Sequence, residues 1–390
     1  MSNSYTTHNL DISESKRCIG CANPRCKNAC PLGNDVPAFL KYVSIGEYNK
    51  AVELIGHPFG EICGYVCPHE LHCQGGCVLG KTGQAVQMGA VERAVFQQYP
   101  YKVERKGNVA NELKVAVVGG GVSGITFAVK MYEQGADVTL YEKDELLSTL
   151  KLIPNFRLPC ESIARIEKEL NGKFTIVKKA VTSKDFTILQ RDFDIVYLAT
   201  GASVLYGLGM VGEELAIPYD KFLRSASHCS DVVVIGGGNT AMDCARLAKR
   251  SGGKVTIAYR RQREDMPAFN NEVDDAYSEQ VQFVYNVAPV KLESHGDKLL
   301  LTLAKTASEG RGKLTVTDET TTILCDTVVS ALGSKFDASI YGELQIGDDA
   351  KHPLSNVYVG GDAVGGKIVA KAVADAMQSA RLVLENLLKK

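Results

Sequence analysis

Two blocks of cysteines near the start of the chain have the number and spacing of metal ligands. The eight residues are Cys18, Cys21, Cys26, Cys30, Cys63, Cys67, Cys73 and Cys77. Dense cysteines on an intracellular enzyme more often bind metal than form disulfides, and eight thiolates satisfy two cubane clusters with four ligands each. Each block also contains a Cys-Pro pair. The pattern therefore predicts two 4Fe–4S clusters.

Zinc and disulfide bonds are the alternatives for these cysteines. Four thiolates also suit a tetrahedral zinc site, although only Cys18 and Cys21 have the Cys-x2-Cys spacing of a zinc knuckle. The neighbouring His69 and His72 could ligate a metal as well. Zinc would be redox-inert, whereas iron–sulfur clusters accept electrons one at a time. We favour iron, and both alternatives stay open.

A glycine-rich turn with the spacing G-x-G-x-x-G follows a short apolar run and opens a helical pattern. Its glycines are Gly119, Gly121 and Gly124, and Glu142 ends the next predicted strand. In dinucleotide-binding folds the first glycine makes the tight turn, the second lets the backbone approach the pyrophosphate, and the third lets helix and strand pack closely. The terminal acid hydrogen-bonds a ribose hydroxyl. The pattern predicts a dinucleotide site, with a glycine turn that binds nothing as the alternative.

A second turn of this kind, with the spacing G-x-G-x-x-A, contains Gly236, Gly238 and Ala241. The strand that follows ends in Tyr259-Arg260-Arg261, without the acid that favours NAD. Arginine at this place can pair with the 2′-phosphate of NADP. The turn therefore predicts NADPH over NADH. NADH stays possible, and these arginines with Arg263 could instead form a solvated basic edge.

Two dinucleotide sites in one chain suggest that one holds a flavin, FAD, and that the other admits a nicotinamide. Two short sequence segments support a flavin site, Tyr197-Leu-Ala-Thr-Gly201 and Tyr358-Val-Gly-Gly-Asp362. Each ends a predicted strand in a turn of small residues, which lets the backbone come close to a large cofactor. Gly361 lies in the second turn, and Asp362 could accept a hydrogen bond from a ribityl hydroxyl. Hydride transfer requires that the nicotinamide and flavin rings meet.

The elements that must position these residues form three zones. Residues 1–105 are predicted to be helical, with helices over Val36–Ile55 and Val86–Gln98. From residue 110 onward, apolar runs alternate with helical patterns, which indicates α/β domains with parallel sheets. We expect 110–225 and 336–390 to form a FAD-binding domain in two parts, with an NAD(P)H-binding domain at 226–335. The predicted strands are Lys114–Gly119, Asp137–Glu142, Asp194–Thr200, Asp231–Gly236, Lys254–Tyr259, Asp326–Ala331 and Asn356–Gly360.

Composition argues against several other classes of function. Hydrophobic residues make up 45% of the 390 residues, and the formal net charge of −1 gives no reason to expect a nucleic-acid partner. No run approaches ~18 consecutive apolar residues, so no membrane span is predicted. The polar N-terminus does not resemble a signal peptide, which predicts a cytoplasmic location. No constellation of His, Asp, Ser and Cys requires an acid–base catalyst, so no catalytic residue is assigned.

From about Cys18 to Leu388 the chain resembles a family of electron-input proteins. Its N-terminal part is similar to that of the glutamate synthase small subunit and of dihydropyrimidine dehydrogenase, and the rest is similar to their FAD and NADPH domains. The motifs are the eight cysteines, Ile153-Pro-Asn-Phe-Arg-Leu-Pro159, Ala199-Thr-Gly201, Gly236-Gly-Gly-Asn-Thr-Ala-Met-Asp243, Tyr259-Arg-Arg261 with Met266-Pro267, and Gly360-Gly-Asp362. The resemblance implies a helical iron–sulfur domain followed by two Rossmann-like domains of the pyridine nucleotide-disulfide oxidoreductase type.

The resemblance also implies roles for individual residues. It implies that Cys18, Cys21, Cys26 and Cys77 hold one cluster and that Cys30, Cys63, Cys67 and Cys73 hold the other. It matches Arg157 to an arginine that contacts FAD. The nucleotide-contacting positions are Gly238, Asn239, Thr240, Ala241, Arg260 and Arg261, and a later nicotinamide-side loop contains Ala331 and Gly333. The chain departs from the family after Glu142, where Leu146-Leu147-Ser148-Thr149 replaces a Gly-Gly pair, and at Ala376, which replaces a glycine.

Together these features predict an NAD(P)H-dependent flavin and iron–sulfur oxidoreductase. NADPH gives a hydride to FAD, and single electrons leave through the clusters to a partner protein or catalytic subunit. The alternative is a self-contained reductase of a small-molecule or ferredoxin acceptor. A flavin disulfide reductase needs a close cysteine pair at the flavin, and the four cysteines after residue 110 include no such pair. A third hypothesis is a non-enzymatic assembly module in which the cofactors are structural.

Overall fold

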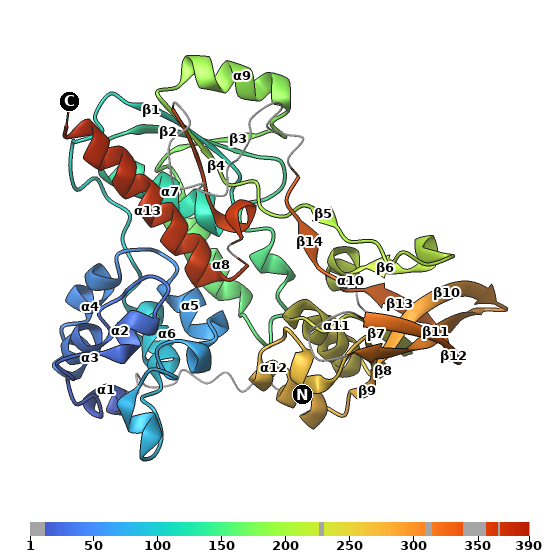
Figure 1. Ribbon diagram of the computed structural model, residues 1–390. Helices are drawn as coiled ribbons and strands as arrows, with labels where there is room; N and C mark the ends of the chain where they lie inside the picture. The colour runs from blue at the N-terminus through green and yellow to red at the C-terminus, as the bar shows by residue number, and fades with distance from the viewer. Residues whose placement is uncertain (1–11, 226–229, 309–313, 338–355, 366, 390) are drawn as a thin grey trace. The chain divides into compact units, whose positions relative to one another are not determined.

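The computed structural model describes residues 12–225, 230–308, 314–337, 356–365 and 367–389, and the chain divides into two compact units (Figure 1). The first unit consists of Met1–Lys151, Asn155–Gly201 and Phe336–Lys390. The second unit consists of Leu152–Pro154 and Ala202–Lys335. Within the described ranges, no helix has both the length and the apolar character needed to cross a membrane.

The first unit begins with a helical region, 12–98, which we call the cysteine lobe. Its elements are α1 Ser13–Lys16, α2 Arg25–Ala29, α3 Val36–Ser44, α4 Tyr48–Ile55, α5 Gly60–Val66, η1 His69–Leu71, η2 Val78–Lys81 and α6 Met88–Gln98. The single helix predicted over Val36–Ile55 is two helices, because Gly46 turns the chain between them with a φ of +82°. Fully buried apolar side chains form the core of the lobe: Phe39, Val43, Ile55, Phe59, Ile62 and Val95.

A five-stranded parallel sheet forms the rest of the first unit, in the order β15-β4-β1-β2-β3. Its strands are β1 Lys114–Val118, β2 Asp137–Glu142, β3 Thr175–Lys178, β4 Ile195–Leu198 and β15 Val357–Val359. Its helices are α7 Val122–Glu133, α8 Cys160–Leu170, α9 Ser183–Asp192 and α13 Val369–Leu387, with α7 and α13 side by side (Figure 1). The near-continuous burial of β1 and β4 is typical of parallel strands covered on both faces. The predicted strands at β1, β2, β4 and β15 are confirmed to within two residues.

The second unit contains another parallel sheet, in the order β6-β13-β7-β8-β9, and an antiparallel sheet β10-β11-β12. The parallel strands are β6 Ile217–Pro218, β7 Asp231–Ile235, β8 Lys254–Tyr259, β9 Gln282–Tyr285 and β13 Thr327–Ser330. The antiparallel strands are β10 Val287–His295, β11 Lys298–Ser308 and β12 Leu314–Cys325. The helices are α10 Tyr219–Ser225, α11 Asn239–Arg250 and α12 Asn270–Ser278. The predicted strands at β7, β8 and β13 are confirmed.

The boundary between the two units differs from the sequence-based division. The sequence placed 110–225 in the flavin domain, whereas the main segment of the second unit starts at Ala202. The reason is strand pairing: β6 pairs with β13, and β5 Val204–Leu205 pairs with β14 Ser334–Lys335. Such short strands carry too few residues for a periodic signal in the sequence.

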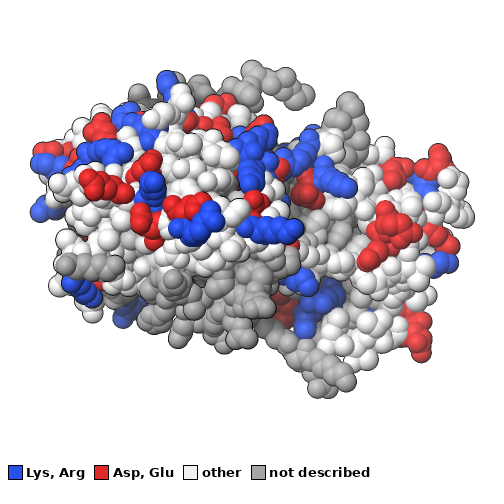
Figure 2. Space-filling view, turned by 90° about the horizontal axis from the view of Figure 1, so that it is seen from above, with Lys and Arg blue, Asp and Glu red and all other residues white. Residues whose placement is uncertain are grey.

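Charged side chains of both signs are interspersed on the face of the molecule shown in Figure 2. This agrees with a sequence that has 44 basic and 45 acidic residues. On the described part of this face, therefore, no broad field of one sign is present to attract a polyanion.

Candidate functional site

Four chain segments meet at the carboxyl edge of the first sheet. Gly361, Gly201 and Gly121 lie in segments that follow the neighbouring strands β15, β4 and β1, and Glu142 is the last residue of β2. The chain order reverses between β1 and β4, and open α/β sheets bind ligands beyond the carboxyl ends of their strands at such a switch point. The fold thus brings the predicted flavin residues of these segments together.

The three glycines of the first turn have the geometry that dinucleotide binding needs. Gly119 has a φ of +109°, and a Cβ there would clash with the carbonyl oxygen of Ala199. A Cβ at Gly124 would clash with the carbonyl oxygen of Gly119, so α7 can pack closely on β1 only with glycine. Gly121 begins α7, and no atom of the described residues lies within 4 Å of its Cβ position. The N-terminus of α7 therefore faces open space that suits a pyrophosphate.

Glu142 is held beside this turn by backbone donors. Its Oε2 accepts the Gly120 N–H at 2.5 Å, and its Oε1 accepts the Asp144 N–H at 2.8 Å. Because both oxygens are fixed, the carboxylate has one orientation at the end of β2, next to the glycine turn. This is the place from which an acid reaches the ribose in dinucleotide-binding folds.

The residues that replace the family's Gly-Gly pair lie against the same turn. The Leu147 N–H donates to the Gly120 carbonyl at 2.9 Å, and the Leu147 side chain is buried. Leu147 has a φ of +55°, in the left-handed region that glycine adopts freely and leucine does not. The chain therefore keeps a glycine-like backbone conformation here and stabilises it by burying the leucine.

A turn of small residues after β15 packs against the helix of the first glycine turn. A Cβ at Gly360 would clash with the Tyr197 hydroxyl, and one at Gly361 would lie 2.9 Å from the Ser123 Cβ. The Ser123 and Tyr197 hydroxyls are 2.8 Å apart. Asp362 follows in η7 Gly361–Val364, and burial raises the pKa of its carboxyl group. A half-buried carboxyl group at this edge is suited to hydrogen-bonding a sugar or ribityl hydroxyl.

Arg157 and Ala376 lie in the same unit. Arg157 is half-buried in the segment before α8, where the Asn155 side-chain oxygen accepts the Cys160 N–H at 2.7 Å. Ala376 is fully buried on α13. The contact of Arg157 with FAD stays a prediction.

The second glycine turn repeats the geometry of the first, at the carboxyl edge of the second sheet. Gly236 has a φ of +148°, and a Cβ there would clash with the carbonyl oxygen of Ala331, which follows the neighbouring strand β13. Gly238 begins α11, and none of the described atoms lies within 4 Å of its Cβ position. Ala241 stands where the first turn has Gly124, and a Cβ added at Gly236 would lie 3.4 Å from the Ala241 Cβ. Gly333, with a φ of +88°, faces open space.

The arginines after β8 are not equivalent. Arg263 pairs with Asp274, and its guanidinium lies 5.0 Å from the centre of the Tyr277 ring. The Arg260 side chain is exposed, and the Arg261 side chain is half-buried. The Thr306 hydroxyl donates to the Arg260 carbonyl at 2.8 Å, which fixes the backbone. Of the three, Arg263 is already neutralised by Asp274, so the exposed Arg260 is the better placed for a 2′-phosphate, and a contact of Arg261 with it stays a prediction.

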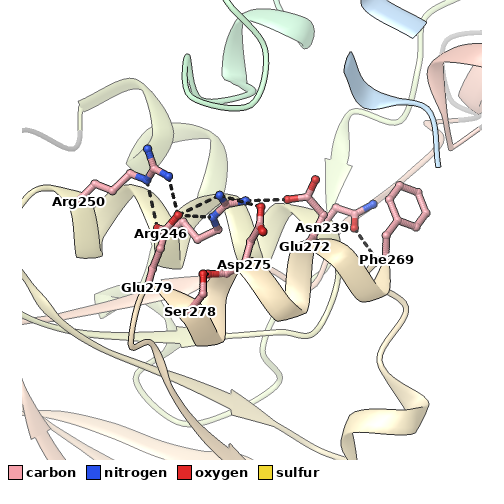
Figure 3. A network of polar contacts seen from close by, with 8 residues as sticks. All are labelled: Asn239, Arg246, Arg250, Phe269, Glu272, Asp275, Ser278 and Glu279. Carbon is pink, nitrogen blue, oxygen red and sulfur yellow. Dashed lines mark hydrogen bonds and ion pairs between the residues drawn. The ribbon is translucent and has the colours of Figure 1, made fainter. Parts of the chain in front are cut away.

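A buried ion-pair network, shown in Figure 3, joins α11 to α12. Arg246 is only 6% exposed, and it pairs with Glu272 at 3.0 Å and with Glu279 at 2.9 Å. The Asn239 side-chain oxygen accepts the Phe269 N–H at 2.9 Å, so this predicted nucleotide contact also fixes the loop before α12. Thr240 is half-buried in the first turn of α11. Sequence reasoning missed Arg246, whose signal is a basic residue on the buried side of an amphipathic helix.

The eight cysteines of the cysteine lobe fall into two neighbourhoods. In the first, Cys26 lies within electrostatic reach of Cys18 and Cys77, and all three line one pocket together with Cys21. In the second, Cys63 lies within reach of Cys30, Cys67 and Cys73. Cys73 also lines the first pocket, so the two neighbourhoods adjoin. They coincide with the two ligand sets that the family resemblance implies.

Close backbone contacts hold the segment of Cys77 against the segment of Cys26. A Cβ at Gly76 would lie 2.9 Å from the carbonyl oxygen of Arg25 and 3.1 Å from the backbone nitrogen of Cys26. A Cβ at Gly75 would clash with the carbonyl oxygen of Glu70. Glycine is required at both positions, and this close approach interleaves the two cysteine blocks.

The chemistry of these thiols fits a metal-bound state. Burial raises the pKa of Cys26, Cys30 and Cys63, so thiolates there need a compensating positive charge. A bound metal supplies that charge and deprotonates its thiol ligands. Across the part of the chain that is described, no three His, Cys, Asp or Glu side chains converge closely enough to hold a single metal ion. The chemistry of the thiols therefore fits metal ligation, and their division into two sets of four stays a prediction.

Glu92 is a further residue that the sequence did not reveal. It lies on the buried side of α6, where burial raises the pKa of its carboxyl group to about 8. When ionised, its carboxylate raises the pKa of the four members of the second neighbourhood, Cys30, Cys63, Cys67 and Cys73. The signal in the sequence is an acid at an apolar position of α6.

Inside the first unit, a buried carboxylate joins the cysteine lobe to the flavin sheet. Glu61 on α5, only 5% exposed, accepts the Ser162 hydroxyl at 2.6 Å and Arg165 Nε at 2.9 Å, both from α8. A second Arg165 nitrogen also donates to Glu61, which makes the contact bidentate. Glu61 is two residues from Cys63, and α8 follows the segment of Arg157. This contact therefore fixes the second cysteine neighbourhood against the predicted flavin domain.

Comparisons with known protein families agree with this architecture. Residues 113–380 match the family described as pyridine nucleotide-disulphide oxidoreductase, and residues 1–103 match dihydropyrimidine dehydrogenase domain II, 4Fe-4S cluster. The glutamate synthase [NADPH] small chain of Escherichia coli is 29% identical, over 94% of this chain and 89% of the relative. The NADP(+)-dependent formate dehydrogenase subunit beta of Moorella thermoacetica is 30% identical, over 91% of this chain and 59% of the relative.

Solved structures show the same fold at low sequence identity. FprA of Mycobacterium tuberculosis in complex with NADPH superimposes with a TM-score of 0.57 and 18% identity, over 71% of this chain and 85% of that one. The thioredoxin reductase of Lactococcus lactis gives a TM-score of 0.57 and 18% identity, over 72% of this chain and all of that one. These matches support the prediction of two Rossmann-like domains.

The glycine turns, the cysteine lobe and both family matches lead to one assignment. The catalytic part is an NAD(P)H-dependent flavin oxidoreductase, and the N-terminal part is an iron–sulfur domain. The chain belongs to the pyridine nucleotide-disulphide oxidoreductase family, within the group that carries an N-terminal 4Fe–4S domain and includes the glutamate synthase small chain.

Proposed function

We propose that the chain is the electron-input subunit of a larger redox enzyme. NADPH binds to the second unit and gives a hydride to FAD at the first unit, and the electrons leave singly through two 4Fe–4S clusters to an acceptor protein. The observation that carries this proposal is the Glu61 contact, which joins α5 of the cysteine lobe to α8 of the flavin domain inside one unit. The names of two relatives, a small chain and a beta subunit, support a partner.

Separate sets of residues bind FAD, NADPH and the clusters. For FAD these are Gly119, Gly121, Gly124, Glu142, Arg157, Gly201, Gly361 and Asp362. For NADPH they are Gly236, Gly238, Asn239, Thr240, Ala241, Arg260, Arg261, Ala331 and Gly333. The clusters take Cys18, Cys21, Cys26 and Cys77 in one set and Cys30, Cys63, Cys67 and Cys73 in the other. In each nucleotide site the helix N-terminus offers N–H donors to phosphate, and the glycines keep side chains out of its path.

In each unit, the side chains at the end of the strand after the glycine turn carry a charge, negative at the end of β2 and positive after β8. This difference in charge distinguishes the two nucleotides. Glu142 hydrogen-bonds the ribose hydroxyls of FAD through a carboxylate that Gly120 and Asp144 hold in place. Arg260 and Arg261 stand at the equivalent place in the second unit and neutralise a 2′-phosphate, which NADPH has and NADH lacks.

A cluster-ligand variant tests the proposed order of electron transfer. Cys63→Ser removes one ligand of the second set, and Cys160→Ser removes an exposed cysteine outside the lobe as a matched control. In Cys63→Ser we expect NADPH still to bleach the flavin absorbance, while reduction of a one-electron protein acceptor is lost. Cys160→Ser should retain both. Equal protein-acceptor reduction by the two variants would contradict the proposal and favour a self-contained flavin reductase.

A further inference from the structure

The pocket of the first cysteine neighbourhood opens beside an exposed apolar side chain. Ile19 lies between Cys18 and Cys21, lines the pocket with them, and is 64% exposed. Most isoleucines are buried, and this one stands in solvent directly beside predicted cluster ligands. The second neighbourhood differs, because Cys63 and Cys73 are buried. The first neighbourhood is therefore the one nearer to solvent.

Three unpaired basic side chains belong to the same surface. Lys16, Arg25 and Lys81 are exposed, and no carboxylate of the described residues forms an ion pair with them. Two acids of the lobe are already engaged, Glu14 by Arg17 at 2.7 Å and Asp35 by Lys27 at 2.9 Å, whereas the exposed Glu70 forms no ion pair among the described residues. The three free cations outnumber this one acid, so the surface has a net positive charge.

Specific contacts bring these cations together although the sequence separates them. Arg17 donates to the carbonyl of Gln84 at 2.5 Å, which holds the chain at Lys16 against the loop that follows Lys81. The Gly76 backbone packs on the carbonyl of Arg25 and leads through Cys77 into η2, which ends at Lys81. These contacts hold the chain segments of the four residues beside one another, and we call Lys16, Ile19, Arg25 and Lys81 the basic rim.

We propose that the basic rim docks the acidic face of a one-electron acceptor protein, with Ile19 as the apolar contact at its centre. This rests on the proposed function, since the electrons come from NADPH: each NADPH releases two electrons and one proton and becomes NADP⁺, and each acceptor molecule takes one electron. The match of charge favours an acidic redox protein such as a ferredoxin over a basic one. Exposed charges steer the encounter, and a central apolar side chain stabilises the complex once water is excluded.

Binding of an oxidised acidic ferredoxin, measured by calorimetry without NADPH, tests the basic rim. The holoprotein should bind it at low ionic strength and lose most of that affinity at about 0.3 M salt, because exposed charges are then screened. The double variant Lys16→Glu/Lys81→Glu should bind at least about tenfold more weakly and show a smaller salt dependence. Lys184→Glu, an exposed position of α9 outside the cysteine lobe, is a single charge-reversal control and should bind like the parent. A separate variant, Ile19→Ser, should weaken binding at both salt concentrations equally.

Three results would overturn the basic rim. They are no binding by the parent, binding of basic cytochrome c in preference to ferredoxin, or equal binding by Lys16→Glu/Lys81→Glu and Lys184→Glu. Iron content and melting temperature of each variant separate lost binding from lost folding. NADPH-dependent bleaching of the flavin separates the two proposals. If the flavin bleaches and the rim variants bind normally, only the rim is wrong, and if NADPH fails to bleach the flavin, the proposed function is wrong.

Discussion

Removing the Glu61 carboxylate should destabilise the first unit more than any exposed charge change. Glu61→Ala leaves the buried Ser162 hydroxyl and the Arg165 guanidinium without their acceptor. Breaking a fully buried pair costs 3–5 kcal/mol, and the Arg165 side chain is 37% exposed, so we expect the lower end, about 3 kcal/mol. For a unit of this size this corresponds to a fall in melting temperature of ~6–12 °C.

Calorimetry of the holoprotein measures this loss. Glu61→Gln keeps the shape and part of the hydrogen bonding, so its loss should be about 1–2 kcal/mol. Glu161→Ala removes an exposed acid from α8, the helix of Ser162 and Arg165, and should change the melting temperature by no more than ~1–2 °C. The double variant Glu61→Ala/Arg165→Ala should lose less than the sum of the single losses, because the two side chains interact. Additive losses, or a Glu61→Ala variant as stable as Glu161→Ala, would refute the reasoning.

Three further predictions concern the nucleotide sites and one buried histidine. Exchanging Arg260 and Arg261 for glutamines should raise KM for NADPH ~10–100-fold and change KM for NADH little. The control Arg263→Gln should leave both KM values unchanged, because the Arg263 side chain already pairs with Asp274. An equal rise in KM for the two coenzymes would exclude a 2′-phosphate contact. Gly121→Ala should fold normally, since its Cβ meets open space, but copurify without FAD; full FAD content would mean that the pyrophosphate lies elsewhere. His57 is fully buried, and burial lowers its pKa to about 3. Between pH 6.5 and 3 the unfolded chain therefore binds a proton at His57 that the folded chain does not bind. The free energy of unfolding should fall by about 1.4 kcal/mol per pH unit as the pH falls through that window. Urea unfolding at several pH values should show a flatter dependence of stability on pH in His57→Asn, and the parent dependence in the exposed-residue control His295→Gln. An unchanged pH dependence in His57→Asn would contradict the assignment of this effect to His57.

The glycine turns were predictable because each glycine meets a local requirement of backbone conformation or close packing. Gly119 and Gly236 have positive φ values next to a neighbouring strand, and such turns recur with fixed spacing between a strand and a helix. The strands around them were predictable for the same reason, since buried parallel strands are near-continuous apolar runs. The break at Gly46 was missed because the apolar spacing continues across it, so periodicity alone cannot separate α3 from α4.

Other parts of the site depend on contacts between distant segments. Glu61 and Glu92 are acids in helices that a sequence pattern places on the surface, and only the packing of α5 and α6 shows that both are buried. The left-handed conformation of Leu147 could not be predicted from the sequence, because leucine rarely adopts it. Tertiary contacts stabilise that conformation here. The Arg246 network likewise needs α12 to be placed before its partners can be recognised.

The central claim is that electrons enter the chain in pairs and leave it singly, and an anaerobic NADPH titration of the purified holoprotein tests it most directly. With one FAD and two clusters per chain we predict about eight irons and uptake of about four electrons, hence about two NADPH per chain, with an electron paramagnetic resonance signal from reduced clusters. A holoprotein with stoichiometric zinc and little iron, or one that stops after a single NADPH with no such signal, would contradict the account.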